Sequence, residues 1–459
     1  MKNILIVLMS NIAYNKHMKI VIDIKCSYSN IQGLTPLLFK VIRNELSYEI
    51  DSSAAYFSKN HFNTKRYLMD KKGTFPTGLI NDVLGVLYDR KVTDSLVIND
   101  HRKWPQPYPE LFSPKFKVTP YASQQEAAEA AMHFGRGTIS MPTGTGKSLV
   151  IALIIAKLSV KTLIVVPTLE IKKQLIESLQ AIFGDSKYIT VENIDSAALK
   201  KKGNYECLII DEAHHVAAKT YHKLNETAWT DIAARFFLTA TPWRNNSEET
   251  LLFKSIAGEL IYKLSYKDAI TQGYIVPVEA FYIELPKIKT NAITWQQVYS
   301  ELVVNSTFRN NRIADILHIL KKNGRSTLCL VKEIKHGNNI SDIAQVPFVN
   351  GQDEVSRDYI KMFNDTEVPV LVGTEGIISE GIDTKPCEYV IIAALGKAKS
   401  AFMQKVGRAV RKFEGKKTAK IILILDRSHR FCLKHYNEQV KILKDEYGIT
   451  PKLLTMEDL

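Results

Sequence analysis

The chain has 459 residues, of which 45% are hydrophobic and 24% are charged, and this composition excludes wholesale disorder, collagen-like repeats and a small disulfide scaffold. At roughly 150 residues per domain, the length predicts about three domains that can each bury a core. The 61 Lys and Arg against 48 Asp and Glu give a formal net charge of +13, which favours a polyanionic partner.

Two features of the sequence indicate where the protein works. The five cysteines contain no C-x-x-C pair, so they predict neither a zinc cluster nor a disulfide framework and fit a reducing compartment. Residues 4–9 form an apolar run without a small-residue cleavage site, and this run is far shorter than the roughly 20 residues of a membrane span. We therefore expect a cytoplasmic protein with no membrane association, in which residues 1–17 are an extension.

The N-terminal quarter of the chain carries much of the positive charge. Through Lys117 it contains 17 Lys and Arg against 10 Asp and Glu, and a proline-rich stretch at residues 104–109 is typical of a linker. We interpret residues 1–112 as a small α+β accessory domain that binds a polyanion.

From about Tyr121 onward, short β-branched apolar runs alternate with helical stretches. Strands that are apolar on both faces and alternate with helices predict a parallel sheet covered on both sides. The runs form two series, at residues 138–141, 162–166, 207–210 and 236–238, and then at 327–331, 368–372, 389–394 and 421–425. We therefore predict an α/β fold class with two tandem parallel-sheet lobes, residues 113–275 and 276–449, and a tail of residues 450–459.

A phosphate-binding loop follows the first of these runs. Its sequence matches G-x-x-x-x-G-K-[ST], except that Met141 stands at the first glycine, and it leads into a helical stretch. Glycines let backbone N–H groups close around phosphate oxygens at a helix N-terminus. Lys147 would reach the β- and γ-phosphates, and the Ser148 hydroxyl would hold Mg²⁺. The candidate nucleotide-binding residues are Met141, Pro142, Thr143, Gly144, Thr145, Gly146, Lys147 and Ser148.

Two acidic residues end the apolar strand expected at 207–210. The carboxyl edge of a parallel sheet is where ligands of α/β proteins bind. Asp211 would coordinate Mg²⁺, and Glu212 would orient or deprotonate the attacking water. For either carboxylate alone, a capping acid followed by surface histidines is the simpler interpretation. The phosphate loop about 60 residues upstream favours the nucleotide site.

The second lobe contains a basic segment at residues 404–411, Gln-Lys-Val-Gly-Arg-Ala-Val-Arg. Arg408 and Arg411 are three residues apart, so we expect them on one face of a helix. A planar, permanently charged guanidinium can stabilise a transferring phosphate, which makes both candidate arginine fingers. The alternative is a solvated basic helix face.

Four segments resemble motifs I, II, III and VI of superfamily 2 helicases in their order and spacing: residues 141–148, 211–214, 239–242 and 404–411. The resemblance covers about residues 121 to 426. It implies two RecA-like lobes that hydrolyse ATP between them and hold a nucleic-acid strand. It also implies catalytic roles for Lys147, Asp211, Glu212, Gln404, Arg408 and Arg411.

Other positions are carried over from the same resemblance one at a time. Tyr121 and Gln124 resemble the adenine-reading motif, although two intervening residues break the usual Tyr-Gln adjacency. In motif VI, lysine stands at position 405, where an arginine is common. The remaining matches are to motif Ia, with Pro167 and Thr168 on strand phosphates, and to motif V, with Thr374 on nucleic acid and Gly381 and Asp383 near the nucleotide.

Within the accessory domain, residues 46–50, 56–68 and 73–79 resemble phage recombination helicases of the UvsW type, which remodel forks, Holliday junctions and R-loops. Lys59, Lys65 and Arg66 alternate with aromatic residues and can supply phosphate contacts and stacking. The alternative is a small sheet with the aromatic side chains inside and the lysines in solvent.

The expected function is that of an ATP-dependent DNA helicase or translocase. We expect it to act as a monomer that tracks a single strand and unwinds or branch-migrates forked and Holliday-junction DNA, in the host cytoplasm if a phage encodes it. One alternative is another superfamily 2 motor, either an RNA helicase or the translocating subunit of a restriction-type system. A nucleic-acid-binding protein with a degenerate motor is a further alternative, against which the intact catalytic residues argue.

Overall fold

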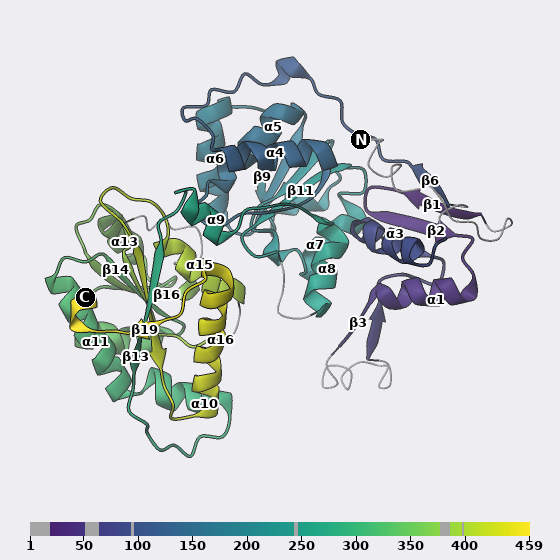
Figure 1. Cartoon of the computed structure of the whole chain (residues 1–459). Helices are drawn as coiled ribbons and strands as arrows, with labels where there is room; N and C mark the ends of the chain where they lie inside the picture. Colours follow the sequence, from purple (N-terminus) through teal and green to yellow (C-terminus); the bar gives the residue numbers. More distant parts are fainter. Residues whose placement is uncertain (1–18, 51–63, 93–95, 243–246, 377–385, 397–398) are drawn as a thin grey trace. The chain divides into compact units, whose positions relative to one another are not determined.

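The computed structural model describes residues 19–50, 64–92, 96–242, 247–376, 386–396 and 399–459 (Figure 1). Contacts between Cα atoms divide the chain into two compact units. Among these described residues, unit 1 comprises those from 19 to 140 and from 147 to 263, and unit 2 comprises those from 141 to 146 and from 264 to 459. No helix in the described ranges is long and apolar enough to cross a bilayer.

The N-terminal part of unit 1 is a small mixed sheet with two helices, as the predicted α+β class requires. The sheet has the order β5-β2-β1-β6, with β1 antiparallel to β2 and parallel to β6. Fully buried and partly buried residues alternate along β1, so one face of the sheet is covered by the helices, and Ile22, Ile42 and Val83 are fully buried there. The elements are β1 (Ile20–Ile24), β2 (Tyr28–Gln32), α1 (Pro36–Glu45), β5 (Thr74–Pro76), the 3-10 turn η1 (Thr77–Leu79), α3 (Ile80–Asp89) and β6 (Leu96–Asp100). A separate antiparallel ribbon joins β3 (Ser47–Glu49) to β4 (Lys65–Tyr67).

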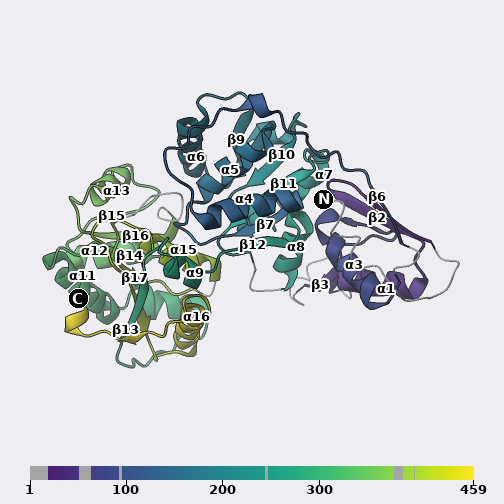
Figure 2. The same cartoon turned by 45° about the horizontal axis from the view of Figure 1, so that its top comes forward.

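The rest of unit 1 is the first lobe, an all-parallel sheet of order β12-β7-β11-β10-β8-β9. Helices α4, α5 and α6 cover one face and α7 and α8 cover the other (Figure 2), which explains why β8, β10 and β11 are buried along their whole length. The strands are β7 (Arg136–Ser140), β8 (Thr162–Val166), β9 (Ile189–Asn193), β10 (Cys207–Ile210), β11 (Ala234–Thr239) and β12 (Leu260–Lys263). The helices are α4 (Ala122–Phe134), α5 (Lys147–Leu158), α6 (Leu169–Phe183), α7 (Lys219–Thr227) and α8 (Ser247–Ala257), with 3-10 turns η2 (Pro109–Leu111), η3 (Ala197–Lys200) and η4 (Ala213–His215).

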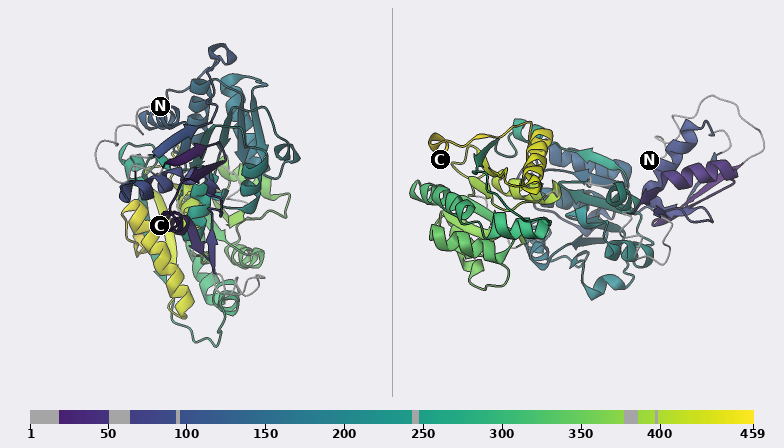
Figure 3. Two further views of the ribbon diagram at one scale, coloured as in Figure 1. Left: turned by 90° about the vertical axis from the view of Figure 1, so that its right-hand side faces the viewer. Right: turned by 90° about the horizontal axis from the view of Figure 1, so that it is seen from below.

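Unit 2 contains the second lobe, a parallel sheet of order β15-β16-β14-β17-β18-β13-β19. Its core is formed with α11 and α12 on one face, and α15 and α16 pack on the other (Figure 3). The strands are β13 (Val278–Glu284), β14 (Thr327–Val331), β15 (Phe348–Val349), β16 (Val370–Thr374), β17 (Tyr389–Ile392), β18 (Ala419–Leu425) and β19 (Lys452–Leu453). The helices are α9 (Tyr266–Thr271), α10 (Trp295–Tyr299), a π-helical turn (Ser300–Val304), α11 (Thr307–Lys322), α12 (Ile334–Ala344), α13 (Ser356–Asn364), α15 (Lys399–Ala409) and α16 (Arg430–Tyr447), with a last 3-10 turn, η6 (Met456–Asp458).

The predicted fold class is confirmed, because both series of apolar runs form parallel strands. Several strand boundaries differ from the prediction by one or two residues, and the difference that bears on the site is at β16, where the strand expected at residues 368–372 lies at Val370–Thr374. Pro369 precedes it, and its carbonyl accepts a hydrogen bond from Thr327 N at the start of β14. This difference matters for the site because the strand now ends on Thr374 itself.

Candidate functional site

The phosphate loop connects β7 to α5, in the strand, loop and helix order that the sequence predicts. Gly144 and Gly146 adopt φ values of 89° and 79°, a left-handed region that side chains rarely enter. Thr145 Oγ1 donates a hydrogen bond of 2.7 Å to the carbonyl of Pro142, which closes the turn. The loop therefore leads its backbone into the N-terminus of α5, where N–H groups and the helix dipole attract phosphate.

The two predicted carboxylates lie at the carboxyl end of β10, beside the helix that begins at Lys147. Lys147 Nζ is 3.6 Å from Glu212 Oε1, although the two residues are far apart in sequence. Asp211 Oδ1 accepts a hydrogen bond of 2.9 Å from the N–H of Glu212. Glu212 has a φ of 46°, and such strained non-glycine residues cluster at functional sites.

Burial raises the pKa of Asp211 to about 6, with the charge of Glu212 adding to the effect and Lys147 opposing it. A cation bound beside this carboxylate would offset the free-energy cost of keeping a buried carboxylate ionised. Mg²⁺ prefers oxygen ligands and is commonly held by one or two carboxylates together with substrate phosphates. The buried carboxylate of Asp211 and the hydroxyl of Ser148, next to the phosphate loop, are oxygen donors of the kind that a nucleotide-bound magnesium ion takes.

The predicted site residues do not include His214, although this histidine belongs to the segment 211–214 that resembles motif II. Its Nδ1 lies 3.2 Å from Glu212 Oε2, and its side chain is almost completely buried. The 3-10 turn η4 directs it back toward the carboxylate, whereas the neighbouring His215 is exposed. The signal available in sequence was the histidine's position two residues after the glutamate.

The residues of motif III belong to the same edge of the sheet. In the strand order, β11 lies between β7 and β10, so its carboxyl end falls between the phosphate loop and Asp211. Thr239 ends β11, and its Oγ1 accepts a hydrogen bond of 3.1 Å from Thr241 N. Both threonines are buried. The fold thus brings motifs I, II and III together at one edge.

Gln124, predicted to read adenine, lies in a different environment from its neighbour Gln125. Gln124 is buried and its Oε1 accepts a hydrogen bond of 2.9 Å from Tyr121 N, which caps α4, whereas Gln125 is exposed. Tyr121 itself is 43% exposed. The pair is therefore held at the start of the helix that precedes the phosphate loop.

In unit 2, Thr374 ends β16 and α15 carries Gln404 and Arg408. The prediction that Arg408 and Arg411 share one helix face is wrong, because α15 ends at Ala409. The chain turns there, the carbonyl of Val410 accepts a hydrogen bond from Val276 N, and Lys416 Nζ bonds the carbonyl of Arg411 at 2.9 Å. Arg411 is thus placed by a loop and Arg408 by the helix.

Residues 141–146 of the phosphate loop belong to unit 2, where they lie against the motif VI segment, residues 404–411. A Cβ added at Gly407 would lie 2.7 Å from the Cβ of Thr143. A Cβ added at Gly144 would lie 3.2 Å from Cγ of Arg411. Both glycines therefore permit an approach that a larger residue would obstruct.

The predicted nucleic-acid contacts are more scattered. Thr168 caps α6, with its Oγ1 accepting a hydrogen bond of 3.3 Å from Ile171 N, and Pro167 precedes it. Lys65 and Arg66 lie on β4 and are partly exposed. The ring of Tyr67 stacks with the guanidinium of Arg43 at 4.1 Å. Gly381, Asp383 and Lys59 lie outside the described residues.

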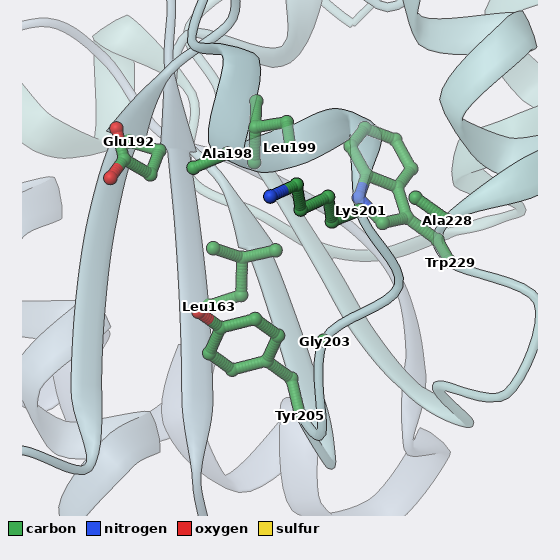
Figure 4. A pocket seen from close by; sticks show the side chains of 9 residues that line it. All are labelled: Leu163, Glu192, Ala198, Leu199, Lys201, Gly203, Tyr205, Ala228 and Trp229. Carbon is green, nitrogen blue, oxygen red and sulfur yellow. The ribbon is translucent and has the colours of Figure 1, made fainter.

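A small hollow opens in the first lobe beside β8, β9 and η3 (Figure 4). Leu163, Tyr205 and Trp229 supply most of its apolar wall. Because Leu163 is near the start of β8 and Tyr205 precedes β10, the hollow is at the amino edge of the sheet, away from Asp211. It is therefore distinct from the predicted nucleotide site.

The fold and the motifs at its sheet edges define a two-lobed nucleoside triphosphatase of the helicase class. Family models agree: the model described as type III restriction enzyme, res subunit, matches residues 117–202 and 186–244, and the helicase conserved C-terminal domain matches residues 309–413. The two matches lie in the two lobes, and the chain resembles superfamily 2 helicases, including those of the UvsW type.

Known relatives are distant. The DNA 3'-5' translocase XPB2 of Sulfurisphaera tokodaii is 26% identical over 366 residues, which cover 67% of this chain and 81% of the relative. The ATP-dependent DNA helicase uvsW of Enterobacteria phage T4 is 21% identical over 355 residues, covering 69% and 70%. A solved fragment described as an HsdR subunit of a type I restriction enzyme from Vibrio vulnificus YJ016 has a TM-score of 0.57 at 18% identity, covering 85% of this chain and 75% of that one, and shows likeness of fold.

Proposed function

We propose that the protein is an ATP-driven DNA motor that unwinds or branch-migrates forked and Holliday-junction DNA in replication, recombination or repair. The observation that carries this proposal is the edge of the first lobe, where Lys147, Asp211 and Glu212 converge. The printed names of the relatives, a DNA translocase and a DNA helicase, support DNA as the substrate.

In this proposal each predicted site residue has a separate role in ATP binding or hydrolysis. Lys147 would bind the β- and γ-phosphates, and Asp211 and Ser148 would hold a magnesium ion that neutralises the charge on the phosphates. Glu212, oriented by His214, would accept a proton from the attacking water. Arg408 and Arg411 would stabilise charge on the transferring phosphate, with Gln404 beside them in motif VI. Tyr121 and Gln124 would read adenine, and Gly381 and Asp383 would lie near the nucleotide.

The strand would be held by Pro167 and Thr168 on the first lobe and by Thr374 on the second, with the lobes proposed at residues 113–275 and 276–449. The accessory domain, residues 1–112, would supply the preference for branched DNA. Lys65 and Arg66 on β4 offer phosphate contacts, and Tyr67 lies beside them for stacking. We expect a monomer that tracks one strand in the cytoplasm, of the host if the gene belongs to a phage.

The second candidate is a translocating subunit of a restriction-type system. The match of residues 117–244 to the restriction-enzyme res model favours it specifically. An RNA helicase is a third candidate, because motor lobes that contact the backbone do not read the sugar.

The test is ATP turnover at fixed salt with equal phosphate concentrations of single-stranded, duplex, forked and Holliday-junction DNA and of RNA. Branched DNA should stimulate ATP turnover more than the other nucleic acids do. Lys147→Ala should abolish ATP turnover with every nucleic acid. Stimulation by duplex DNA alone would favour the restriction-type motor, and stimulation by RNA alone would overturn the DNA assignment.

A further inference from the structure

Lys405 is a buried lysine in motif VI that forms an ion pair with Glu375. Its side chain is 6% exposed, and its Nζ lies 2.5 Å from Oε1 of Glu375. Lysines are almost never buried unless they are paired, so the contact explains why this side chain is tolerated in α15. Dissolved salt weakens ion pairs that are exposed to solvent, and it weakens this pair less because the pair is largely buried.

The two partners belong to different motifs. Glu375 directly follows Thr374, the last residue of β16 and the position expected to contact the nucleic-acid strand. Lys405 precedes Arg408 by three residues on α15, so the two side chains share one face of the helix. The ion pair therefore joins the expected strand contact to the helix that carries an expected arginine finger.

Helix α15 is anchored in the second lobe by its apolar face. Its residues Met403, Val406 and Ala409 are buried, and the helix packs on β17 and β18. Near its start, Lys399 forms a second ion pair, with Glu446 of α16. That pair holds the same helix but leads away from motif V, which makes it a matched control.

We propose that the Glu375–Lys405 ion pair is a positioning contact that couples strand binding at Thr374 to the placement of Arg408. The proposal rests on the proposed function, in which Thr374 contacts the strand and Arg408 stabilises the transferring phosphate. When a strand occupies the end of β16, the carboxylate of Glu375 is fixed, and the ion pair fixes α15 with it. Lys405 itself touches neither nucleotide nor nucleic acid in this scheme.

The experiment compares full-length wild type with Lys405→Met, Glu375→Gln, Lys405→Arg and the control Lys399→Met. ATP turnover is measured without nucleic acid and with saturating single-stranded DNA or RNA, together with the nucleic-acid concentration that gives half-maximal stimulation. Lys405→Met and Glu375→Gln should keep unstimulated turnover within about twofold and lose about tenfold of the stimulation, a typical size for coupling between sites. Lys405→Arg and Lys399→Met should remain stimulated.

A double variant, Lys405→Met with Glu375→Gln, separates positioning from simple stability. Removing one partner leaves a shielded charge unpaired, whereas removing both does not, so the double variant should unfold at a higher temperature than either single variant. Under the proposal it still lacks stimulation. If stimulation returned with stability, or if Lys405→Met were stimulated like wild type, the inference would be overturned. A wild-type enzyme that neither DNA nor RNA stimulates would overturn the proposed function and this inference together.

Discussion

Nη2 of Arg235 donates a hydrogen bond of 3.1 Å to Oγ of Ser27, which joins a central strand of the first lobe to the loop between β1 and β2. The guanidinium is fully buried and its Nη1 also bonds Asn225 Oδ1 at 2.6 Å. Nearby, Nη1 of Arg136 bonds the carbonyl of Cys26 at 2.6 Å. Two arginines of the motor lobe thus hold the accessory domain by its first turn.

We expect Arg235→Met to destabilise unit 1 by about 2 to 4 kcal/mol, because it leaves buried acceptors without donors. The acceptors are Asn225 Oδ1 and the carbonyls of Ile232 and Trp229. Urea unfolding followed by circular dichroism would measure the change. Arg427→Met is the control, since Arg427 is 54% exposed and pairs with Glu284 on the surface, where such pairs contribute roughly 0 to 1 kcal/mol. Equal losses for the two variants would contradict the assigned role of Arg235.

A second prediction concerns Gly78, where η1 presses against the end of α8. A Cβ at Gly78 would lie 2.2 Å from the carbonyl oxygen of Lys254 and 2.4 Å from that of Ser255. Backbone atoms cannot turn aside as a flexible side chain can, so Gly78→Ala should cost about 1 to 3 kcal/mol or more.

Gly85 supplies the matched control for this substitution. It lies in the neighbouring helix α3, and a Cβ there would meet nothing within 4 Å. Gly85→Ala should therefore stabilise the protein by about 0.5 to 1 kcal/mol through helix propensity. Chemical unfolding of both variants would check the opposite signs, and a neutral Gly78→Ala would show that η1 is free to shift.

The contacts of Arg235 and Gly78 could not be predicted from the sequence, whereas both lobes and the phosphate loop could. The alternation of β-branched runs with helical stretches predicted both lobes, because fully buried parallel strands need apolar side chains on both faces. Glycines at positions 144 and 146 predicted the phosphate loop because few other residues adopt its backbone. Ser27, which accepts a hydrogen bond from Arg235, is 208 residues away along the chain, and no local sequence pattern indicates such a pairing.

Motif VI shows the same limit at shorter range. A spacing of three predicted that Arg408 and Arg411 share a helix face, but spacing does not reveal that α15 ends at Ala409. Likewise, the sequence shows that lysine stands at position 405 in place of the common arginine, but it does not indicate a role for this residue. Its burial against Glu375 depends on how β16 and α15 pack, which is a tertiary property.

The proposed base can be tested by Glu212→Gln, which keeps the size of the side chain but removes its ability to accept a proton. We expect the maximal rate of ATP hydrolysis to fall by about 10² to 10⁴, a usual range for losing general base catalysis. ATP binding should remain, because Lys147 and the phosphate loop are unchanged. Fluorescent ATP analogue binding and phosphate release would measure the two effects. The control is Glu192→Gln, which removes a carboxylate that pairs with Lys172 on the same lobe.

His336 gives a prediction for the dependence of stability on pH. It is fully buried in α12, with Nε2 3.1 Å from Oδ1 of Asn310. Burial lowers the pKa of His336 to about 3, and the nearby positive charge of Arg309 adds to the effect. Since the pKa in the folded state is below that of the unfolded chain, the unfolded state binds the extra proton first. The stability contributed by neutral His336 is therefore complete above the ordinary histidine pKa of about 6.5 and is lost as the pH falls toward 3.

This group alone should lower the free energy of unfolding by up to about 1.4 kcal/mol per pH unit within that window. His336→Gln cannot gain the proton, so its unfolding free energy should fall less steeply than that of wild type between about pH 6 and pH 4. Urea titrations across this range would measure the difference in slope. At about pH 8, where wild-type His336 is neutral in both states, the variant should differ from wild type only through packing and the bond to Asn310. Parallel slopes for the two proteins would mean that His336 binds the proton equally well in the folded and the unfolded state, which would contradict the lowered pKa.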